Sequence, residues 1–79
     1  MKCLFDLAVG KSAVIDKILT VGSMKRRFLD IGLIENTEVE CVGQSPLGDP
    51  KAFLIRGAVI AIRKADCQNI ILKDDEKWD

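Results

Sequence analysis

The stretch that decides the fold is Phe53-Leu54-Ile55-Arg56-Gly57-Ala58-Val59-Ile60-Ala61-Ile62. Two runs rich in β-branched and aromatic residues flank a glycine, and glycine followed by another residue between such runs is typical of a two-residue type II′ turn. This predicts a β-hairpin with Gly57 and Ala58 in the turn. With a two-residue turn at Gly57 and Ala58, Arg56 pairs with Val59, and Ile55 pairs with Ile60. Four apolar side chains then share one face of the hairpin: Phe53, Ile55, Ile60 and Ile62.

Three further strands are predicted around this hairpin. Residues 12–21 have the β-branched content of a first strand, and residues 37–42 alternate between apolar and polar side chains. A short helical turn at residues 64–68 leads to a closing strand at residues 70–72. Short strands separated by turn residues predict a mainly β fold, a small barrel or sandwich of about five strands.

One helix is expected between the first and second strands, over residues 23–31. Ser23 is a suitable N-cap residue, and Gly32 is placed to end the helix in the left-handed conformation. Met24, Phe28 and Ile31 are spaced by four and three residues and form one apolar stripe. We expect this stripe to cover one end of the barrel.

The composition of the 79 residues excludes several classes of function. Twelve Lys and Arg balance twelve Asp and Glu, so no overall positive field favours nucleic-acid binding. Histidine and tyrosine are absent, and no phosphate-binding glycine motif or nucleophile with a histidine base is present. We therefore expect a protein that is not an enzyme and binds no nucleic acid.

Cysteine usage and hydropathy point to the cytoplasm. The three cysteines have no C-x-x-C spacing, and the first residues lack the apolar core of a secretory signal. The longest uninterrupted apolar run, residues 58–62, is far shorter than the roughly twenty residues of a membrane helix. A reduced cytoplasmic protein that does not span the membrane is predicted, and exposed strand edges leave weak self-association open.

Metal ligands are sparse in this sequence. Glu38 and Glu40 are expected on one face of the strand at residues 37–42, opposite Val39 and Cys41, where a pair of carboxylates can bind a hard cation. Cys41 is predicted to be a small core residue, while Cys3 and Cys67 remain candidate ligands for a soft metal. No resident cofactor is expected. The candidates for weak binding of Fe(II) or another divalent metal are these four: Cys3, Cys67, Glu38 and Glu40.

Two segments are candidates for partner binding. The segment Ser45-Pro46-Leu47-Gly48-Asp49-Pro50 contains both prolines of the chain, which stiffen the backbone and display Leu47 and Gly48 at a turn. A hydrophobic side chain on a stiff loop loses little entropy on docking. The second segment is the basic run at the start of the helix, which is either a solvated face or a docking patch: Lys25, Arg26 and Arg27.

Several motifs together resemble the FeoA family over nearly the whole chain. They are the Arg27-Phe28-Leu29-Asp30-Ile31-Gly32-Leu33 segment, the Pro46-Leu47-Gly48-Asp49-Pro50 loop, Ile55-Arg56-Gly57 and Ile60-Ala61-Ile62-Arg63. The resemblance implies a small SH3-like β-barrel in the cytoplasm that works with FeoB, a ferrous-iron transporter in the membrane with a cytosolic G-domain. The domain is expected to span residues 1–73, followed by an acidic tail at residues 74–79 that frays.

From this resemblance we predict an accessory protein of ferrous iron uptake that binds and regulates FeoB at the inner face of the membrane. The predicted binding residues are Lys25, Arg26, Arg27, Pro46, Leu47, Gly48, Asp49 and Pro50. One alternative is a transition-metal sensor or carrier. Another is an SH3-like module that binds a short extended peptide segment.

Overall fold

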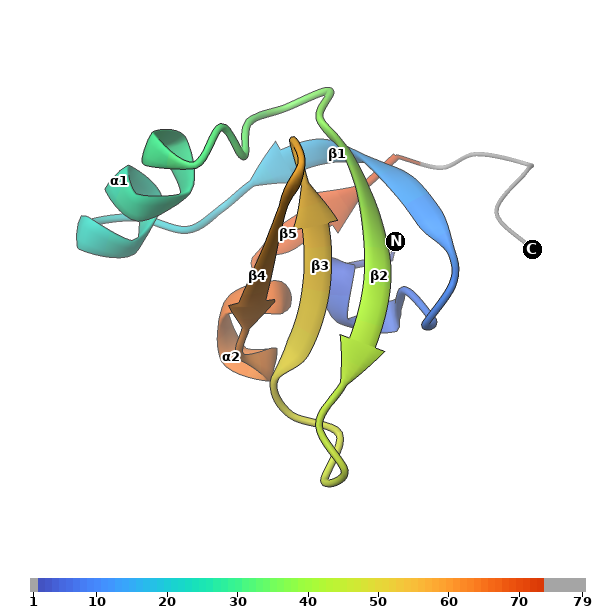
Figure 1. Cartoon of the computed structure of the whole chain (residues 1–79). Helices are drawn as coiled ribbons and strands as arrows, with labels where there is room; N and C mark the ends of the chain where they lie inside the picture. The colour runs from blue at the N-terminus through green and yellow to red at the C-terminus, as the bar shows by residue number, and fades with distance from the viewer. Residues whose placement is uncertain (1, 74–79) are drawn as a thin grey trace.

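The computed structural model describes residues 2–73, and five antiparallel strands form a single sheet in the order β4-β3-β2-β1-β5 (Figure 1). The strands are β1 (Ser12–Ile18), β2 (Glu38–Gln44), β3 (Lys51–Ile55), β4 (Ala58–Ile62) and β5 (Ile70–Leu72). The helices are a 3-10 turn η1 (Leu4–Asp6), α1 (Ser23–Asp30) and α2 (Lys64–Cys67). The mainly β fold, with one helix after the first strand and a helical turn before the last, is confirmed. The sheet is open, because β4 and β5 are its two edges.

The core lies on the concave face of this curved sheet. Alternation along β2 buries Val39 and Cys41, as predicted, and alternation along β3 buries Phe53 and Ile55. Leu4 and Leu7 from the N-terminal segment, Ile15 from β1, Leu33 after α1 and Cys67 from α2 complete the same cluster. The sheet is therefore covered at one end by η1 and α2, and at its side by α1 (Figure 1).

The β3–β4 hairpin is present, but its turn differs from the prediction. Ile55 pairs with Ala58 and Phe53 with Ile60, so the turn residues are Arg56 and Gly57. Both have positive φ, 49° and 86°, as in a type I′ turn rather than type II′. The pairing is shifted by two residues from the predicted register. Because a shift of two preserves the alternation of a strand, the predicted face is still correct.

Several element boundaries differ slightly from the prediction. The first strand was predicted over residues 12–21, but β1 ends at Ile18, so residues 19–21 lie outside it. The second strand was predicted over residues 37–42, whereas β2 begins at Glu38 and extends to Gln44. α1 ends at Asp30 instead of residue 31, and its N-cap is Gly22 without a side-chain cap, not Ser23. Gly32 has a φ of 83°, which confirms the predicted left-handed end of the helix. The predicted tail at residues 74–79 lies outside the described residues.

Candidate functional site

The loop between β2 and β3 displays one large hydrophobic side chain. Leu47 is 94% exposed, the largest exposed fraction among the large hydrophobic residues described. Gly48 follows it with a φ of 88°, and its N–H donates to the carbonyl of Ser45 at 2.7 Å. Leu47 therefore lies at the tip of a tight turn, as the sequence predicted.

The base of this loop is fixed to the sheet by polar contacts. Ser45 N–H donates to the carbonyl of Pro50 at 3.0 Å, which closes the loop. The Asp49 carboxylate accepts the backbone N–H of Lys64, the first residue of α2, at 2.8 Å. The loop is thus held both by its own strands and by a segment that follows β4.

Lys51, which the sequence analysis did not single out, fixes the N-terminal segment beside this loop. The side chain is only 8% exposed, and its ammonium group donates to the carbonyls of Phe5 at 2.8 Å and Leu7 at 3.1 Å. The same ammonium lies 4.7 Å from the centroid of the Phe5 ring, a cation–π geometry. These contacts satisfy a buried charge and tie η1 to the start of β3.

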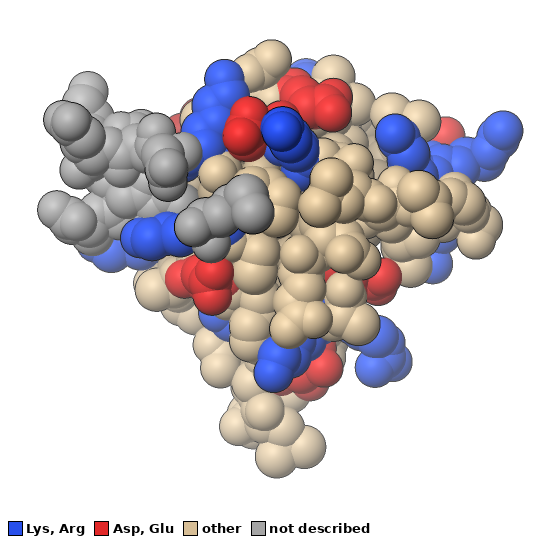
Figure 2. All heavy atoms as spheres, turned by 180° about the vertical axis from the view of Figure 1, so that it is seen from behind, with Lys and Arg blue, Asp and Glu red and all other residues tan. Residues whose placement is uncertain are grey.

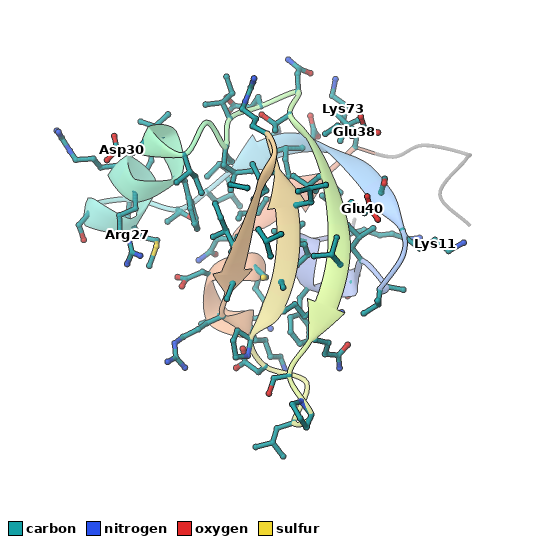
Figure 3. All side chains as sticks on the ribbon, viewed as in Figure 1. Lys11, Arg27, Asp30, Glu38, Glu40 and Lys73 are labelled. Carbon is teal, nitrogen blue, oxygen red and sulfur yellow. The ribbon has the colours of Figure 1, made fainter. Side chains whose placement is uncertain are left out.

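The basic run of α1 is divided between two sides of the helix. Lys25 and Arg26 line a shallow surface depression with Leu29. Arg27 lies with Met24 on the side that faces β4, away from Asp30 (Figure 3). The β2–β3 loop is at the opposite end of the molecule from α1 (Figure 1). The structure therefore does not bring the two predicted binding segments together.

A groove separates α1 from the edge strand β4. Its volume is about 230 Å³, and its apolar lining comes from Met24, Phe28 and Ile31 of the helix segment and Ile60 and Ile62 of β4. Its charged rim is formed by Arg27, Arg63 and Asp66. The apolar stripe of the helix was expected to cover one end of the barrel, and Met24, Phe28 and Ile31 all pack against the core. Only Phe28 of the three is buried, so Met24 and Ile31 also line the groove, which the sequence did not predict.

Exposed apolar side chains continue on the outer side of the α1 region. Val21 is 80% exposed, and Leu19 and Leu29 are each slightly more than half exposed. The face seen from behind has an uncharged central area with charged side chains around its rim (Figure 2). No helix in the described part of the chain is long and apolar enough to cross a membrane.

The candidate metal ligands do not converge. Among residues 2–73, no three Cys, Asp or Glu side chains gather into a possible metal site. Glu38 and Glu40 point from β2 toward the side on which Lys73 and Lys11 lie (Figure 3). The depression beside this carboxylate pair is lined by the polar side chains of Ser12, Asn36 and Thr37 and by Arg56, and it contains no third carboxylate.

Cys67 is a poor metal ligand in this fold. It is fully buried, and its thiol donates to the carbonyl of Ile62 at 3.6 Å. Burial, with a smaller contribution from Cys3, raises the pKa of the Cys67 thiol to about 12, so the thiolate that metals bind is disfavoured. Cys3 is half-buried and Cys41 is buried, and all three cysteines are free thiols.

Comparisons with known proteins agree with this fold. A sequence model of the FeoA domain matches residues 2–74. The solution structure of iron(II) transport protein A from Clostridium thermocellum is 28% identical with a TM-score of 0.85, covering 91% of this chain but 44% of that one. This chain therefore spans less than half the length of that relative. No curated protein sequence matches the chain.

Two shorter relatives are covered more fully. The solution structure of FeoA protein from Chlorobium tepidum is 22% identical with a TM-score of 0.86, covering 96% of this chain and 76% of that one. The crystal structure of Stenotrophomonas maltophilia FeoA complexed with zinc, described as an SH3 domain protein, is 21% identical with a TM-score of 0.80, covering 92% and 91%. The SH3-like fold is thereby confirmed. In the described residues of this chain, no three possible metal ligands come together.

Proposed function

Because the chain belongs to the FeoA domain family, we propose that it is a non-enzymatic accessory protein of ferrous iron uptake that binds and regulates FeoB. In this proposal it acts in the cytoplasm and docks on the cytosolic region of the transporter at the inner face of the membrane. The observation that carries the proposal is the display of Leu47 on a loop fixed at its base.

The loop has the energetic properties of a recognition element. Burying a leucine side chain in a partner pocket contributes about 2 kcal/mol of hydrophobic free energy. The hydrogen bonds of Ser45, Gly48 and Asp49 already order the backbone, so the entropy lost on docking is small. No contact within the described chain competes for the Leu47 side chain, which is 94% exposed.

The basic residues of α1 are proposed as a second contact. Lys25 and Arg26 are exposed beside Leu29, and charges at the rim of an interface mainly accelerate association and set orientation. Because α1 and the β2–β3 loop lie at opposite ends of the fold, one partner must reach both ends, or two parts of it must bind separately (Figure 1).

The direct test is an NMR titration of the labelled protein with the cytosolic region of its cognate FeoB, with and without guanine nucleotide. We expect amide shifts centred on Leu47 and Gly48, and loss of binding in Leu47→Asp. Val9→Asp is the matched control, because Val9 is also an exposed turn residue, 52% accessible, outside the proposed contact. Equal affinity for both variants would exclude the loop as the binding site.

The α1 contact is tested separately with Lys25→Glu/Arg26→Glu. Reversal of both charges should slow association and reduce its dependence on salt, while leaving the loop contact in place.

A metal-sensor role is tested by anaerobic equilibrium dialysis with Fe(II). Stoichiometric binding there, with amide shifts near Cys3 or Glu38, would favour that alternative over the docking proposal.

A further inference from the structure

The outer edge of β4 has backbone hydrogen-bonding groups that the sheet does not use. In a hairpin with a two-residue turn, the residues flanking the turn form a hydrogen-bonded pair, here Ile55 and Ala58. The alternation of an antiparallel ladder then directs the N–H and C=O groups of Val59 and Ala61 away from β3. Within the part of the chain described, these groups have no hydrogen-bond partner.

The space beside this edge is a groove rather than a covered surface. β4 is the last strand of the sheet, and α1 lies on the same side without pairing to it (Figure 1). The groove of about 230 Å³ between them is lined by Met24, Phe28, Ile31 and Ile60. An extended chain laid along β4 would complete the ladder through Val59 and Ala61 and direct alternate side chains into this apolar groove.

Charges at both ends of β4 decide what kind of chain fits. Arg56 precedes the strand, Arg63 and Lys64 follow it, and Arg27 reaches the groove from α1. Asp66 is the one acidic residue of the groove lining. The site is therefore complementary to a segment that carries acidic residues on both sides of an apolar run.

The same charges disfavour a second copy of this chain as the occupant. In an antiparallel pair of β4 strands that aligns Val59 of one copy with Ala61 of the other, Arg56 of each copy lies at the same end as Arg63 and Lys64 of the other. Like charges directly opposite each other destabilise a strand pair. Charged flanks of this kind are a common protection of edge strands against self-association.

We infer that the β4 edge and the α1 groove bind an extended segment of a partner protein, with alternating apolar residues and acidic flanks, as an added strand of the sheet. This surface is separate from the Leu47 loop, and the inference stands whether or not that loop binds FeoB. The domain would then bind an acidic extended segment by strand addition. This mode of binding does not need the exposed aromatic groove that proline-rich ligands require.

The experiment uses a designed probe, the peptide Glu-Glu-Val-Thr-Val-Thr-Val-Glu-Glu, titrated into the labelled full chain and followed by amide shifts. We expect saturable shifts at Val59, Ala61, Met24 and Arg27, and at least tenfold weaker binding of the same peptide with lysine in place of glutamate. Absence of shifts at millimolar peptide, or shifts confined to β5, would overturn the inference. Concentration-dependent dimerisation through β4 without peptide would assign the edge to a second copy and overturn it equally.

Two sets of variants separate the backbone contact from the charge contact. Ala61→Pro removes one outward N–H at an edge position that tolerates proline, and should weaken peptide binding at least tenfold, whereas Ala61→Thr keeps the N–H and should bind normally. If Ala61→Pro does not fold, Arg27→Glu/Arg63→Glu gives an independent test. It should reverse the preference, so that the lysine-flanked peptide binds more tightly than the glutamate-flanked one. An unchanged preference would contradict the assigned groove.

Discussion

Both ends of this small domain contribute apolar side chains to the core, but they differ in the polar side-chain contacts that hold them. At the loop end, which comprises residues 45–51, η1 and α2, charged and polar groups make the connections: Lys51 to the carbonyls of Phe5 and Leu7, and Asp49 to the N–H of Lys64. The α1 arm, residues 19–36, is attached by two buried apolar side chains, Phe28 and Leu33. Hydrogen bonds also hold it: the N–H of Leu19 donates to the carbonyl of Asn69 at 2.7 Å, the N–H of Asn36 to the carbonyl of Ile15 at 2.8 Å, and Nε of Arg56 to the carbonyl of Gly32 at 2.8 Å. No side chain of the helix α1 itself takes part in these bonds.

The difference affects what each region can do. Hydrogen bonds are directional, so the loop end presents Leu47 in one geometry and suits a preformed contact. Only one side of α1 is buried, and a groove remains between this helix and β4. The loop end is therefore suited to display a side chain to a partner. The α1 arm is suited to bind a partner segment in the groove beside β4.

Removal of the main attachment of the arm should have the largest effect on stability. Phe28→Ala leaves a cavity where a side chain is 4% exposed, and should lower the free energy of unfolding by about 3 kcal/mol. Amides of α1 should exchange with solvent much faster, while those of β2 and β3 remain protected until global unfolding. Denaturant unfolding and hydrogen exchange measure the two effects. Leu29→Ala, at a 52% exposed position of the same helix, is the control and should change stability by less than about 0.5 kcal/mol.

In the contrary case, Phe28→Ala would accelerate amide exchange equally in α1 and throughout the sheet. That result would mean that the arm and the strands unfold as one unit, and that the groove beside β4 cannot widen independently.

Removal of the Lys51 ammonium group, which bonds the N-terminal segment at the loop end, should have the next largest effect on stability. Lys51→Met keeps an apolar stem but leaves the carbonyls of Phe5 and Leu7 without the ammonium donor, at a cost of about 2 kcal/mol. Because Cys67 is buried at this end, its alkylation rate reports the local opening. We expect faster alkylation of Cys67 in Lys51→Met. Lys64→Met is the matched control, since Lys64 is exposed and its Nζ lies 5.4 Å from the centroid of the Phe5 ring, without a hydrogen bond of its ammonium to the described residues.

The fold was largely predictable because its signals are periodic. The buried faces of the hairpin and of β2 follow from alternation, which remains correct even when the register shifts by two residues. The turn itself was not predictable from local preference. Arg56 has a φ of 49°, a conformation that favours glycine or asparagine, and its guanidinium Nε donates to the carbonyl of Gly32 at 2.8 Å. This contact joins residues 24 positions apart, and no local pattern shows it.

The candidate site was predictable to a similar degree. Proline spacing indicated the exposed position of Leu47, because stiff loops are local features. Lys51 was missed because its partners lie in another segment of the chain, more than forty residues away. The groove at β4 was missed for a related reason. The order of strands, which makes β4 an edge, depends on tertiary pairing that hydrophobic periodicity does not contain.

A smaller effect is expected at the junction between the arm and the hairpin turn. Gly32 has a φ of 83°, and a Cβ atom there would meet the Cδ of Arg56 at 2.5 Å. Gly32→Ala should therefore lower the free energy of unfolding by about 1 kcal/mol and weaken the Arg56 contact. Gly57→Ala is the control, because Gly57 has a similar φ with nothing within 4 Å of its would-be Cβ. An equal loss in both variants would show that only backbone strain matters, and not the approach of Arg56.

The smallest effect on stability is expected at the tip of the β2–β3 loop. Leu47→Ser removes a side chain that is 94% exposed, so the melting temperature should not change measurably. If the loop end is a preformed display, the amides of Ser45, Gly48 and Lys64 should keep their chemical shifts, because their hydrogen bonds do not involve the Leu47 side chain. Binding to the cytosolic region of FeoB should nevertheless weaken at least tenfold. If Leu47→Ser keeps its melting temperature and its amide chemical shifts but loses binding, Leu47 serves recognition and not folding. If the variant is destabilised, Leu47 has a structural role, and the loop is not held by its polar contacts alone.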